Sequence, residues 1–388
     1  MNIRVLAIVS VLFHGYVGVR LLPGLAGHVW AFGGLAVWLV ASALVMPLGL
    51  GRRRRSSHGP RPLRTVLLTW AGLLFMGLFS SLLVLTLLRD ASLLVLWAMG
   101  LVLSSVAVPA WAATSAQAVP LLALAVTVWG FWNARRTAAV VRVDVPVAGL
   151  APALHGFTLA QISDIHVGPT IRRAYLQRIV QRVNALGADV VAVTGDLVDG
   201  SVPELTHHVG ALAGLQSRHG TFFVTGNHEY YSGAHAWVDE LRRIGLTVLL
   251  NEHVVLHTHQ AGHPPTPLVL AGVTDFNADQ FDAAHRSDPV AALHGAPAGA
   301  LRVLLAHQPR SAAAAASAGF DLQISGHTHG GQFWPWNLVV PLQQPFTAGL
   351  NRLHGLWVYT SRGTGYWGPP KRFGAPSEIT LLRLVVKR

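Results

Sequence analysis

Five short stretches of the sequence combine carboxylate, imidazole and amide side chains with glycine. They are Asp164-Ile165-His166, Gly195-Asp196, Gly226-Asn227-His228-Glu229, His307, and Gly326-His327-Thr328-His329. Oxygen and imidazole ligands without sulfur suit divalent ions such as Mn, Fe or Zn. The chain has no cysteine, which excludes thiolate metal sites, disulfides and cysteine nucleophiles. These groups are too many for one ion and about right for two, so we expect a dinuclear centre.

The spacing of His327 and His329 fits such a centre. In an extended or turning segment, histidines two residues apart can direct their imidazoles at different ions, whereas on a helix they would diverge. A carboxylate that bridges the ions would hold them roughly 3.5–4 Å apart, which is the spacing used to bind the attacking and leaving oxygens in phosphoryl displacement. We therefore expect one of these two histidines on each metal ion.

Each of the five stretches directly follows a segment with the pattern of a buried strand. These segments are FTLAQIS, DVVAVT, GTFFVT, LRVLLA and DLQIS, and amphipathic helical segments such as RAYLQRIVQRVNAL alternate with several of them. This alternation predicts an α/β domain whose strands are covered by helices. Ligands of open α/β folds bind at the carboxyl ends of the strands, so the five stretches should meet at one edge of a sheet.

The ordered set DxH, GD, GNHE, H and GHTH resembles the calcineurin-like metallophosphoesterase superfamily, and the resemblance covers about Leu154 to Leu384. The longer motif GHTHGGQ and the tail Ser361–Leu384 are similar to those of the membrane-associated bacterial YkuE and YaeI phosphoesterases. The resemblance implies a four-layer α/β/β/α sandwich.

The resemblance also implies a role for each site residue. By similarity, one metal ion is bound by Asp164, His166 and His329, the other by Asn227, His307 and His327, and Asp196 bridges the two. His228 corresponds to the family residue that contacts the phosphate and protonates or stabilises the leaving oxygen, so His228 and Asp196 are the expected catalytic residues. Two divalent ions are the implied cofactors, with Mn favoured over Fe or Zn. The implied reaction is hydrolysis of a phosphate ester by a metal-bridging hydroxide.

Other residues near the motifs have two interpretations each. Asp199 could orient a ligand or form a turn, and Glu229 could orient its neighbours or cap the following helix. The aromatic group Phe333, Trp334 and Trp336 could form a substrate wall or a membrane-facing lip, or could pack under the loop. Arg362 and Arg372 could pair with a substrate phosphate or be ordinary surface arginines.

The first part of the chain has the composition of a membrane protein. Of all 388 residues, 52% are hydrophobic and only 12% charged, about half the charged share of a typical soluble domain. Apolar runs long enough to cross a bilayer follow one another before residue 136. We expect a transmembrane helical bundle over residues 1–136, a linker over 137–152 and the metallophosphoesterase domain over 153–388. Arg89 and Asp90 interrupt one run, and a second break is expected near Ala112–Pro120, so we predict five spans, with four as the alternative.

The charge distribution bears on orientation and partners. Residues 1–150 carry twelve arginines and two aspartates, and these arginines lie at the ends of apolar runs, which is typical of membrane orientation signals and argues against nucleic-acid binding. The arginine-rich loop 51–64 should be cytoplasmic, and five spans then place the catalytic domain outside the cytoplasm. Asn133–Arg136 favours the opposite side. We take the extracytoplasmic side as the prediction, for a multi-pass protein of a bacterial inner membrane.

The predicted function is that of a membrane-anchored, dinuclear metal-dependent phosphohydrolase. A membrane anchor and tryptophan-rich loops make a lipid-linked or envelope phosphoester an attractive substrate, one version being the lipid pyrophosphate cleaved by UDP-diacylglucosamine-type hydrolases. A broad phosphodiesterase for soluble esters is the competing enzyme. A non-catalytic membrane sensor or scaffold that binds a phospholigand is the alternative of another class, although intact ligand motifs argue against it.

Overall fold

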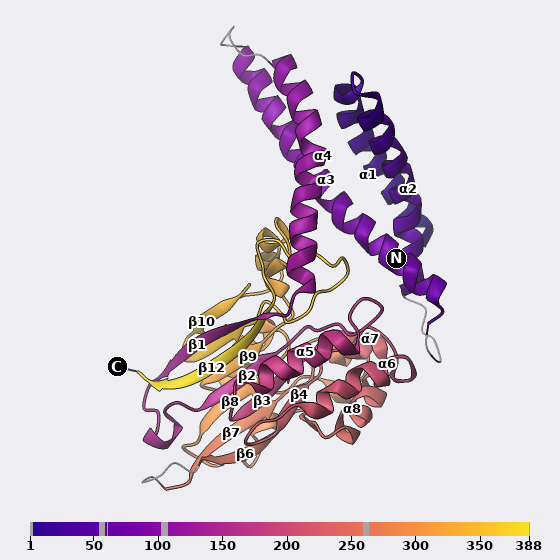
Figure 1. Ribbon diagram of the computed structural model, residues 1–388. Helices are drawn as coiled ribbons and strands as arrows, with labels where there is room; N and C mark the ends of the chain where they lie inside the picture. The colour runs from indigo at the N-terminus through magenta and orange to yellow at the C-terminus, as the bar shows by residue number, and fades with distance from the viewer. Residues whose placement is uncertain (1–2, 54–58, 60, 102–107, 259–263, 388) are drawn as a thin grey trace. The chain divides into compact units, whose positions relative to one another are not determined.

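The computed structural model describes residues 3–53, 59, 61–101, 108–258 and 264–387, and it divides into two compact units (Figure 1). The first unit contains Met1–Arg55, Arg61–Asn133 and the short segment Gly368–Phe373. The second contains residues 134–367 and the chain from Gly374 onward.

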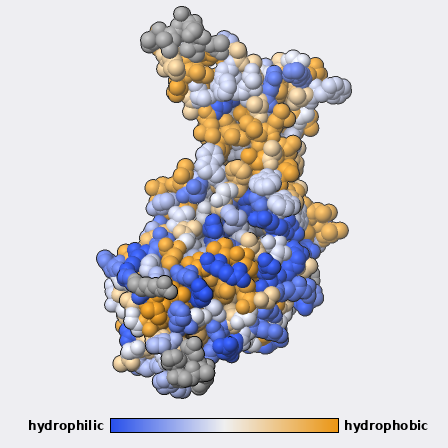
Figure 2. Space-filling view, turned by 60° about the vertical axis from the view of Figure 1, so that its left-hand side comes forward, coloured by the Kyte–Doolittle hydropathy of each residue, from blue (hydrophilic) through white to orange (hydrophobic). Residues whose placement is uncertain are grey.

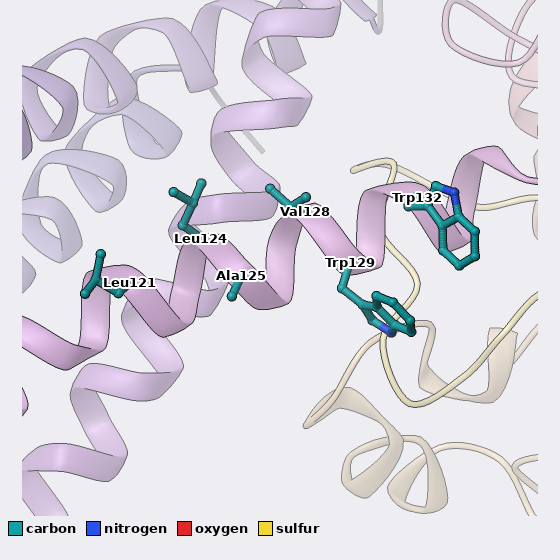
Figure 3. A pocket seen from close by; sticks show the side chains of 6 residues that line it. All are labelled: Leu121, Leu124, Ala125, Val128, Trp129 and Trp132. Atoms are coloured by element: carbon teal, nitrogen blue, oxygen red, sulfur yellow. The ribbon is translucent and has the colours of Figure 1, made fainter.

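Four helices make up most of the first unit: α1 (Ile3–Leu21), α2 (Val29–Arg53), α3 (Leu63–Gly100) and α4 (Val108–Arg135). Among the described residues, these are the helices long and apolar enough to cross a membrane. Figure 2 shows hydrophobic side chains gathered on the surface of this unit. One face of α4 carries an apolar pocket, shown in Figure 3, whose lining residues are Leu121, Leu124, Ala125, Val128, Trp129 and Trp132. Such outward-facing apolar surface is expected where lipid takes the place of water.

The five-span prediction is wrong in the part of the chain that the structure describes, because α3 continues through Arg89 and Asp90. The two charges are satisfied inside the helical unit. Arg89 donates to Asp90 at 3.0 Å and to Ser115 at 3.0 Å, and the Arg20 side chain donates to Asp90 at 2.7 Å. Because paired charges in an apolar environment are far less unfavourable than isolated ones, the helix does not have to end there.

The second break, expected near Ala112–Pro120, is also not found. Helix α4 includes this whole stretch, with Pro120 inside it. The four-span alternative therefore holds for the described residues. Residues 54–58 and 60 of the arginine-rich loop lie outside the described part of the chain.

The segment Gly368–Phe373 groups with the helices through hydrogen bonds. The Lys371 ammonium donates to the carbonyl of Gly77 at 3.0 Å and to the Ser81 hydroxyl, and the Arg372 backbone N–H donates to the Gly130 carbonyl at 2.9 Å. A piece of chain close to the C-terminus thus completes the helical unit.

The second unit is built on two six-stranded sheets. The first has the order β1-β12-β2-β3-β4-β5 and the second the order β10-β11-β9-β8-β7-β6. The strands are β1 (Ala139–Val147), β2 (Thr158–Ile162), β3 (Val190–Thr194), β4 (Thr221–Val224), β5 (Thr247–Val248), β6 (Glu252–Thr258), β7 (Thr266–Gly272), β8 (Leu301–Leu305), β9 (Leu322–Ser325), β10 (Gly349–Leu353), β11 (Leu356–Thr360) and β12 (Glu378–Val386). Helices α5 (Arg173–Asn184), α6 (Val202–Val209), α7 (Asn227–Ser232), α8 (Ala234–Arg243) and α9 (Ala312–Ala318) complete the unit.

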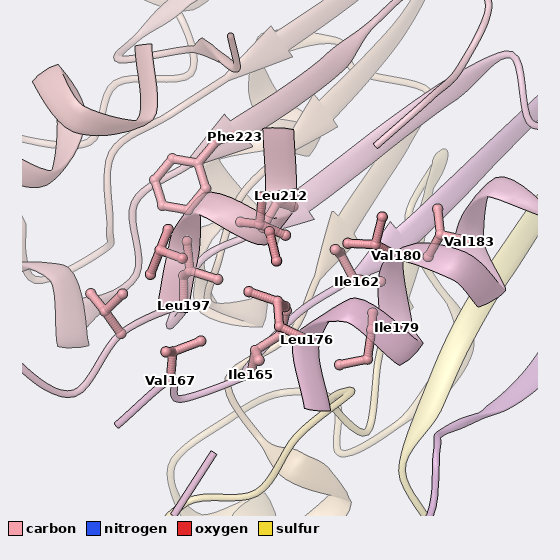
Figure 4. Close-up of a cluster of buried hydrophobic side chains, with 14 of the residues drawn as sticks. Ile162, Ile165, Val167, Leu176, Ile179, Val180, Val183, Leu197, Leu212 and Phe223 are labelled. Carbon is pink, nitrogen blue, oxygen red and sulfur yellow. The ribbon is translucent and has the colours of Figure 1, made fainter. Parts of the chain in front are cut away.

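Three separate hydrophobic clusters show that these elements form four layers. One cluster joins the helices α5, α6 and α8 to the first sheet, and Figure 4 shows part of it, with Leu176 and Ile179 of α5 near Ile162. The second cluster lies between the two sheets, and the third joins the second sheet to α9. The predicted α/β/β/α sandwich is confirmed.

The linker expected at residues 137–152 contains a strand of the first sheet. Strand β1 pairs in parallel with β12 over nine positions, from Ala139 opposite Glu378 to Val147 opposite Val386. The exposed Arg383 guanidinium also pairs with Asp144 across the two strands at 2.7 Å. The segment therefore belongs to the folded domain.

Candidate metal centre

The five motifs that carry the candidate ligands lie at the carboxyl ends of neighbouring strands. Those after β2, β3 and β4 come from adjacent parallel strands of the first sheet, and those after β8 and β9 come from adjacent parallel strands of the second. The residues predicted to bind metal are Asp164, His166, Asp196, Asn227, His307, His327 and His329. All but His327 are buried, and His327 is half-buried.

Asp164, His166 and His329 form one group whose ligand atoms all lie within 4.8 Å of one another. The Nε2 atoms of His166 and His329 are 3.0 Å apart, and Nε2 of His329 is 3.5 Å from Oδ1 of Asp164. Such a set of two imidazoles and one carboxylate could hold a divalent transition metal.

Asp196, His307 and His327 form a second group with the same property. Oδ2 of Asp196 lies 3.3 Å from Nε2 of His307, and that nitrogen is 3.1 Å from Nδ1 of His327. The same Asp196 oxygen is 3.9 Å from Nε2 of His166 in the first group. Asp196 thus lies between the two groups, where a bridging carboxylate would have to be.

Asn227 supplies a test of whether these residues fit a metal. Its side chain is buried, and its Oδ1 atom has no hydrogen-bond partner. A buried carbonyl oxygen without a partner is unfavourable by roughly 1–3 kcal/mol, and a divalent cation would satisfy it. Together with imidazole nitrogens that face one another at about hydrogen-bond distance, this orphaned oxygen fits a metal centre.

The electrostatics of the second group differ among its three side chains. Although burial lowers it, the charge of Asp196 raises the pKa of His307 well above its usual value, so His307 would lose a proton on binding a metal ion. Burial and the charge of His307 lower the pKa of His327 to about 3, so its imidazole is neutral and keeps a lone pair at physiological pH. Burial alone would raise the pKa of Asp196, but the neighbouring charges of His307 and His228 hold it well below its usual value. Asp196 is therefore an ionised carboxylate.

The backbone at the centre is unusual. Five of the seven predicted ligands have a positive φ: Asp164 (53°), His166 (57°), Asp196 (51°), His327 (70°) and His329 (51°). Residues other than glycine rarely adopt this left-handed backbone conformation, and those that do so cluster at functional sites.

Glycines next to the ligands allow close approach. A Cβ atom added to Gly226 would overlap the carboxylate of Asp196, and one added to Gly326 would overlap that of Asp164. The glycines of the GNHE and GHTH motifs are therefore required by packing against the predicted ligands.

Glu229 holds two of the loops together and does not face the centre as a ligand. One of its carboxylate oxygens accepts from the backbone N–H groups of Gly226 and Asp196 at 2.7 and 2.9 Å, and the other accepts from Leu197 at 2.8 Å. The bond to Gly226 also caps the start of α7. Both roles expected for Glu229 are thus present. Burial and the charge of Asp196 raise the pKa of Glu229 to about 7.

His228, the predicted phosphate contact, is half-buried at the rim of the centre. Its Nε2 is 3.9 Å from Oδ2 of Asp196, and its Nδ1 is 2.5 Å from Oδ1 of Asp199. Asp199 therefore orients an imidazole, so the first of its two expected roles, orienting a side chain or forming a turn, is present. The rings of Tyr231 and Trp367 stand edge-on to His228, with centroids at 5.1 and 5.8 Å. Sequence analysis missed both rings, although Tyr231 is the second residue after GNHE.

The last residue of GHTHGGQ explains why this motif accompanies the C-terminal tail. The Gln332 side chain accepts from the Trp367 backbone N–H and donates to the Trp367 carbonyl, each at 2.8 Å. Gln332 thereby fixes the aromatic residue that contacts His228.

The remaining candidates fall into two kinds. Trp334 and Trp336 are 40% and 51% exposed, so they do not pack under the loop, whereas Phe333 is half-buried. Arg362 donates to Glu378 at 2.7 Å, and Arg372 is fully buried in the segment that groups with the helices. Neither arginine is an ordinary surface residue.

Comparison with known proteins finds relatives of the part of the chain that carries this candidate centre. A family model described as calcineurin-like phosphoesterase matches residues 157–331, which include every predicted ligand. A transmembrane protein with a metallophosphoesterase domain from Danio rerio is 39% identical over 269 residues, covering 67% of this chain and 61% of that protein. An uncharacterized metallophosphoesterase from Aquifex aeolicus is 32% identical over 224 residues, covering 57% of this chain and 82% of that protein. The uncharacterized metallophosphoesterase YkuE of Bacillus subtilis is 27% identical over 241 residues, covering 59% of this chain and 79% of that protein.

These matches confirm the predicted resemblance, including the similarity to YkuE. The chain spans less than two thirds of the length of the Danio rerio relative, so the agreement concerns the shared part. The four apolar helices and the transmembrane relative also support a membrane protein. By its motifs, its fold and these relatives, the chain belongs to the calcineurin-like phosphoesterase family.

Proposed function

We propose that this protein is a membrane-anchored phosphohydrolase whose centre holds two divalent metal ions. The observation that carries the proposal is the division of the ligands into two groups, Asp164–His166–His329 and Asp196–His307–His327, with Asp196 between them. Asn227 adds a buried oxygen without a partner. When bound, two cations would supply the Lewis acidity that activates water and neutralises phosphate charge, and manganese is our favoured metal.

The residues of the chain have separate tasks in this hydrolysis. Asp196 supplies an ionised carboxylate between the two groups. His228 is held by Asp199 through Nδ1, and its Nε2 lies on the side of Asp196. Nε2 is the atom that would donate a proton or a hydrogen bond to the leaving oxygen. Glu229 keeps the loops that carry Asp196 and Asn227 in register.

The first prediction tests catalysis. Replacing Asp196 by Ala should lower kcat/KM for manganese-dependent hydrolysis of bis-p-nitrophenyl phosphate at least about 100-fold, equivalent to roughly 2.7 kcal/mol, because both groups lose a ligand. His207→Ala, at an exposed histidine on α6, is the control and should retain full activity. Equal rates in the two variants would contradict the proposal. A wild-type protein that binds phosphate and manganese but hydrolyses no ester would favour a sensor or scaffold.

We further propose that the substrate is a phosphoester with an apolar, lipid-like part. The segment after His329 carries large exposed hydrophobic residues, which are Trp334, Trp336, Leu338, Val339 and Leu342. At the rim beside His228, Trp367 is 49% and Tyr231 62% exposed. Exposed apolar groups of this kind next to a site typically mark contact with a membrane or an apolar ligand. A lipid pyrophosphate, like that of UDP-diacylglucosamine-type hydrolases, is one form of this substrate.

The second prediction compares an acylated phosphodiester in detergent micelles with the same head group lacking acyl chains. The acylated compound should have a KM at least about tenfold lower, equivalent to about 1.4 kcal/mol. The double change Trp334→Ser and Trp336→Ser should remove most of this difference while leaving kcat for bis-p-nitrophenyl phosphate unchanged. Equal KM values for the two wild-type reactions would favour the broad phosphodiesterase for soluble esters.

The four-span arrangement changes the proposed orientation. The arginine-rich stretch 51–64 joins α2 to α3, so it is separated from the residues after α4 by two spans, and the two fall on the same side. By the positive-inside rule the arginine-rich loop is cytoplasmic, and Arg135 and Arg136 at the end of α4 agree with it. We therefore propose a bacterial inner-membrane protein with a cytoplasmic catalytic domain, in place of the extracytoplasmic side expected from five spans.

A further inference from the structure

A further group of residues that could hold a metal ion lies outside the centre. His235 at the start of α8, Asp282 and His285 each offer a ligand atom, and these atoms all lie within 4.8 Å of one another. Nε2 of His235 is 2.9 Å from Oδ2 of Asp282, and the His235 and His285 ring centroids are 4.8 Å apart. None of the three belongs to the family motifs described above.

Neighbouring groups hold two of these side chains in place. Oδ1 of Asp282 accepts from the Ala284 backbone N–H at 2.9 Å, which leaves Oδ2 for His235 or a cation. The Tyr230 hydroxyl lies 2.9 Å from Nδ1 of His285. When Nδ1 donates to that hydroxyl, Nε2 keeps a lone pair, and this is how outer partners orient metal-binding histidines.

The donor set indicates which ligand fits. Two imidazoles and one carboxylate suit Zn²⁺ and related transition-metal ions, whereas Mg²⁺ and Ca²⁺ prefer oxygen ligands. His235 is exposed and the other two residues are half-buried, so water can complete the coordination. A histidine–aspartate pair near the surface is a weak contact because water screens it, and it does not by itself explain the convergence of a second histidine.

We propose that His235, Asp282 and His285 form a separate binding site for one Zn²⁺ ion. Its place in the fold suggests a role. Tyr230 packs against Phe281, the residue before Asp282, with ring centroids at 5.8 Å. Tyr231 packs against the same ring at 5.5 Å and against His228 at 5.1 Å. Zinc would fix the segment that carries Phe281 against α7 and α8, and would thereby hold the aromatic rim beside His228.

The test measures zinc bound by the full-length protein in detergent. We expect the double variant His235→Ala, His285→Ala to bind one Zn²⁺ per chain fewer than the wild type, by elemental analysis after equilibrium dialysis. His207→Ala, the exposed-histidine control, should match the wild type. Equal zinc contents in the double variant and the control would overturn the proposal.

A second measurement separates this site from the dinuclear centre. In the Asp196→Ala background, Zn²⁺ should still slow hydrogen exchange in residues 278–286 at least about tenfold, and the added His235→Ala, His285→Ala changes should abolish the effect. Asp282→Asn, which retains an oxygen for the Ala284 N–H, should require at least about tenfold more zinc. Slowing that persists in the triple variant would place the zinc elsewhere and overturn the site, whatever the fate of the dinuclear centre.

Discussion

Asp199 contacts two imidazoles of the centre, and the two contacts differ. Its Oδ1 lies 2.5 Å from Nδ1 of His228 but 3.4 Å from Nδ1 of His166. The shorter contact is a strong, charge-assisted hydrogen bond, whereas the longer one is at the limit of hydrogen bonding. Asp199 should therefore matter more for His228, the proposed substrate contact, than for His166, a proposed metal ligand.

The third prediction follows from this difference. Replacing Asp199 by Asn should lower kcat for bis-p-nitrophenyl phosphate about 10- to 100-fold, because His228 loses the charge that orients and stabilises it. The manganese content of the purified protein should stay at the wild-type value. Loss of manganese with an unchanged kcat at saturating metal would show that the contact to His166 is the important one.

Individual candidate ligands could be named from the sequence because each stands in a short local motif after a buried strand. Their close approach in space could not be predicted, because Asp164 and His329 lie far apart in the sequence and are brought together only by the arrangement of the two sheets. Asp199 was left open, because a carboxylate three residues after Asp196 fits a turn as well as a hydrogen bond. Trp367 was missed because its link to His228 depends on Gln332, from another loop.

The turn between β4 and α7 positions Asn227 and His228 by means of Gly226. A methyl group there would overlap the Asp196 carboxylate, and the Asp196 backbone lies equally close. Because both neighbours are part of a packed loop, the strain cannot be relieved by turning a flexible side chain. Overpacking of this kind is destabilising by about 1–3 kcal/mol.

The fourth prediction is that Gly226→Ala lowers the melting temperature of the protein and weakens manganese binding at least about tenfold. Differential scanning calorimetry and metal titration would measure the two effects. Gly355→Ala is the matched control, because a Cβ atom at Gly355 meets nothing within 4 Å and its φ is not positive. Tight manganese binding in the Gly226 variant would show that the turn has more freedom than its packing indicates.

Helices and strands could be predicted where a local sequence pattern marks them. They were misjudged where they depend on partners that are distant in the sequence. The strands before the motifs were found because continuous apolar runs mark buried strands. Strand β1 was taken as a linker because its partner β12 is more than 200 residues away. Helix α3 was divided at Arg89 and Asp90 because two of their partners belong to other helices: Arg20 pairs with Asp90, and Ser115 accepts a hydrogen bond from Arg89.

At the scale of the whole molecule, the number of spans decides on which side the catalytic domain works. With an odd total number of spans, the loop 51–64 and the catalytic domain lie on opposite sides of the membrane. With four spans, they lie on the same side. Both arginine signals are then satisfied together, whereas five spans set them against each other. A cytoplasmic domain would meet substrates made inside the cell, and an external one would meet envelope substrates.

The fifth prediction uses the absence of cysteine from the chain, which makes single introduced cysteines unambiguous reporters. In intact bacterial cells, a membrane-impermeant maleimide should label Ser104→Cys, which lies between α3 and α4 and outside the described residues. It should label Ala213→Cys, at an exposed position of the catalytic domain, only after permeabilisation. Ser57→Cys, in the arginine-rich loop and likewise outside the described residues, should behave like Ala213→Cys. If Ala213→Cys and Ser57→Cys instead fall on opposite sides, the number of spans between them is odd, and the four-span arrangement is wrong.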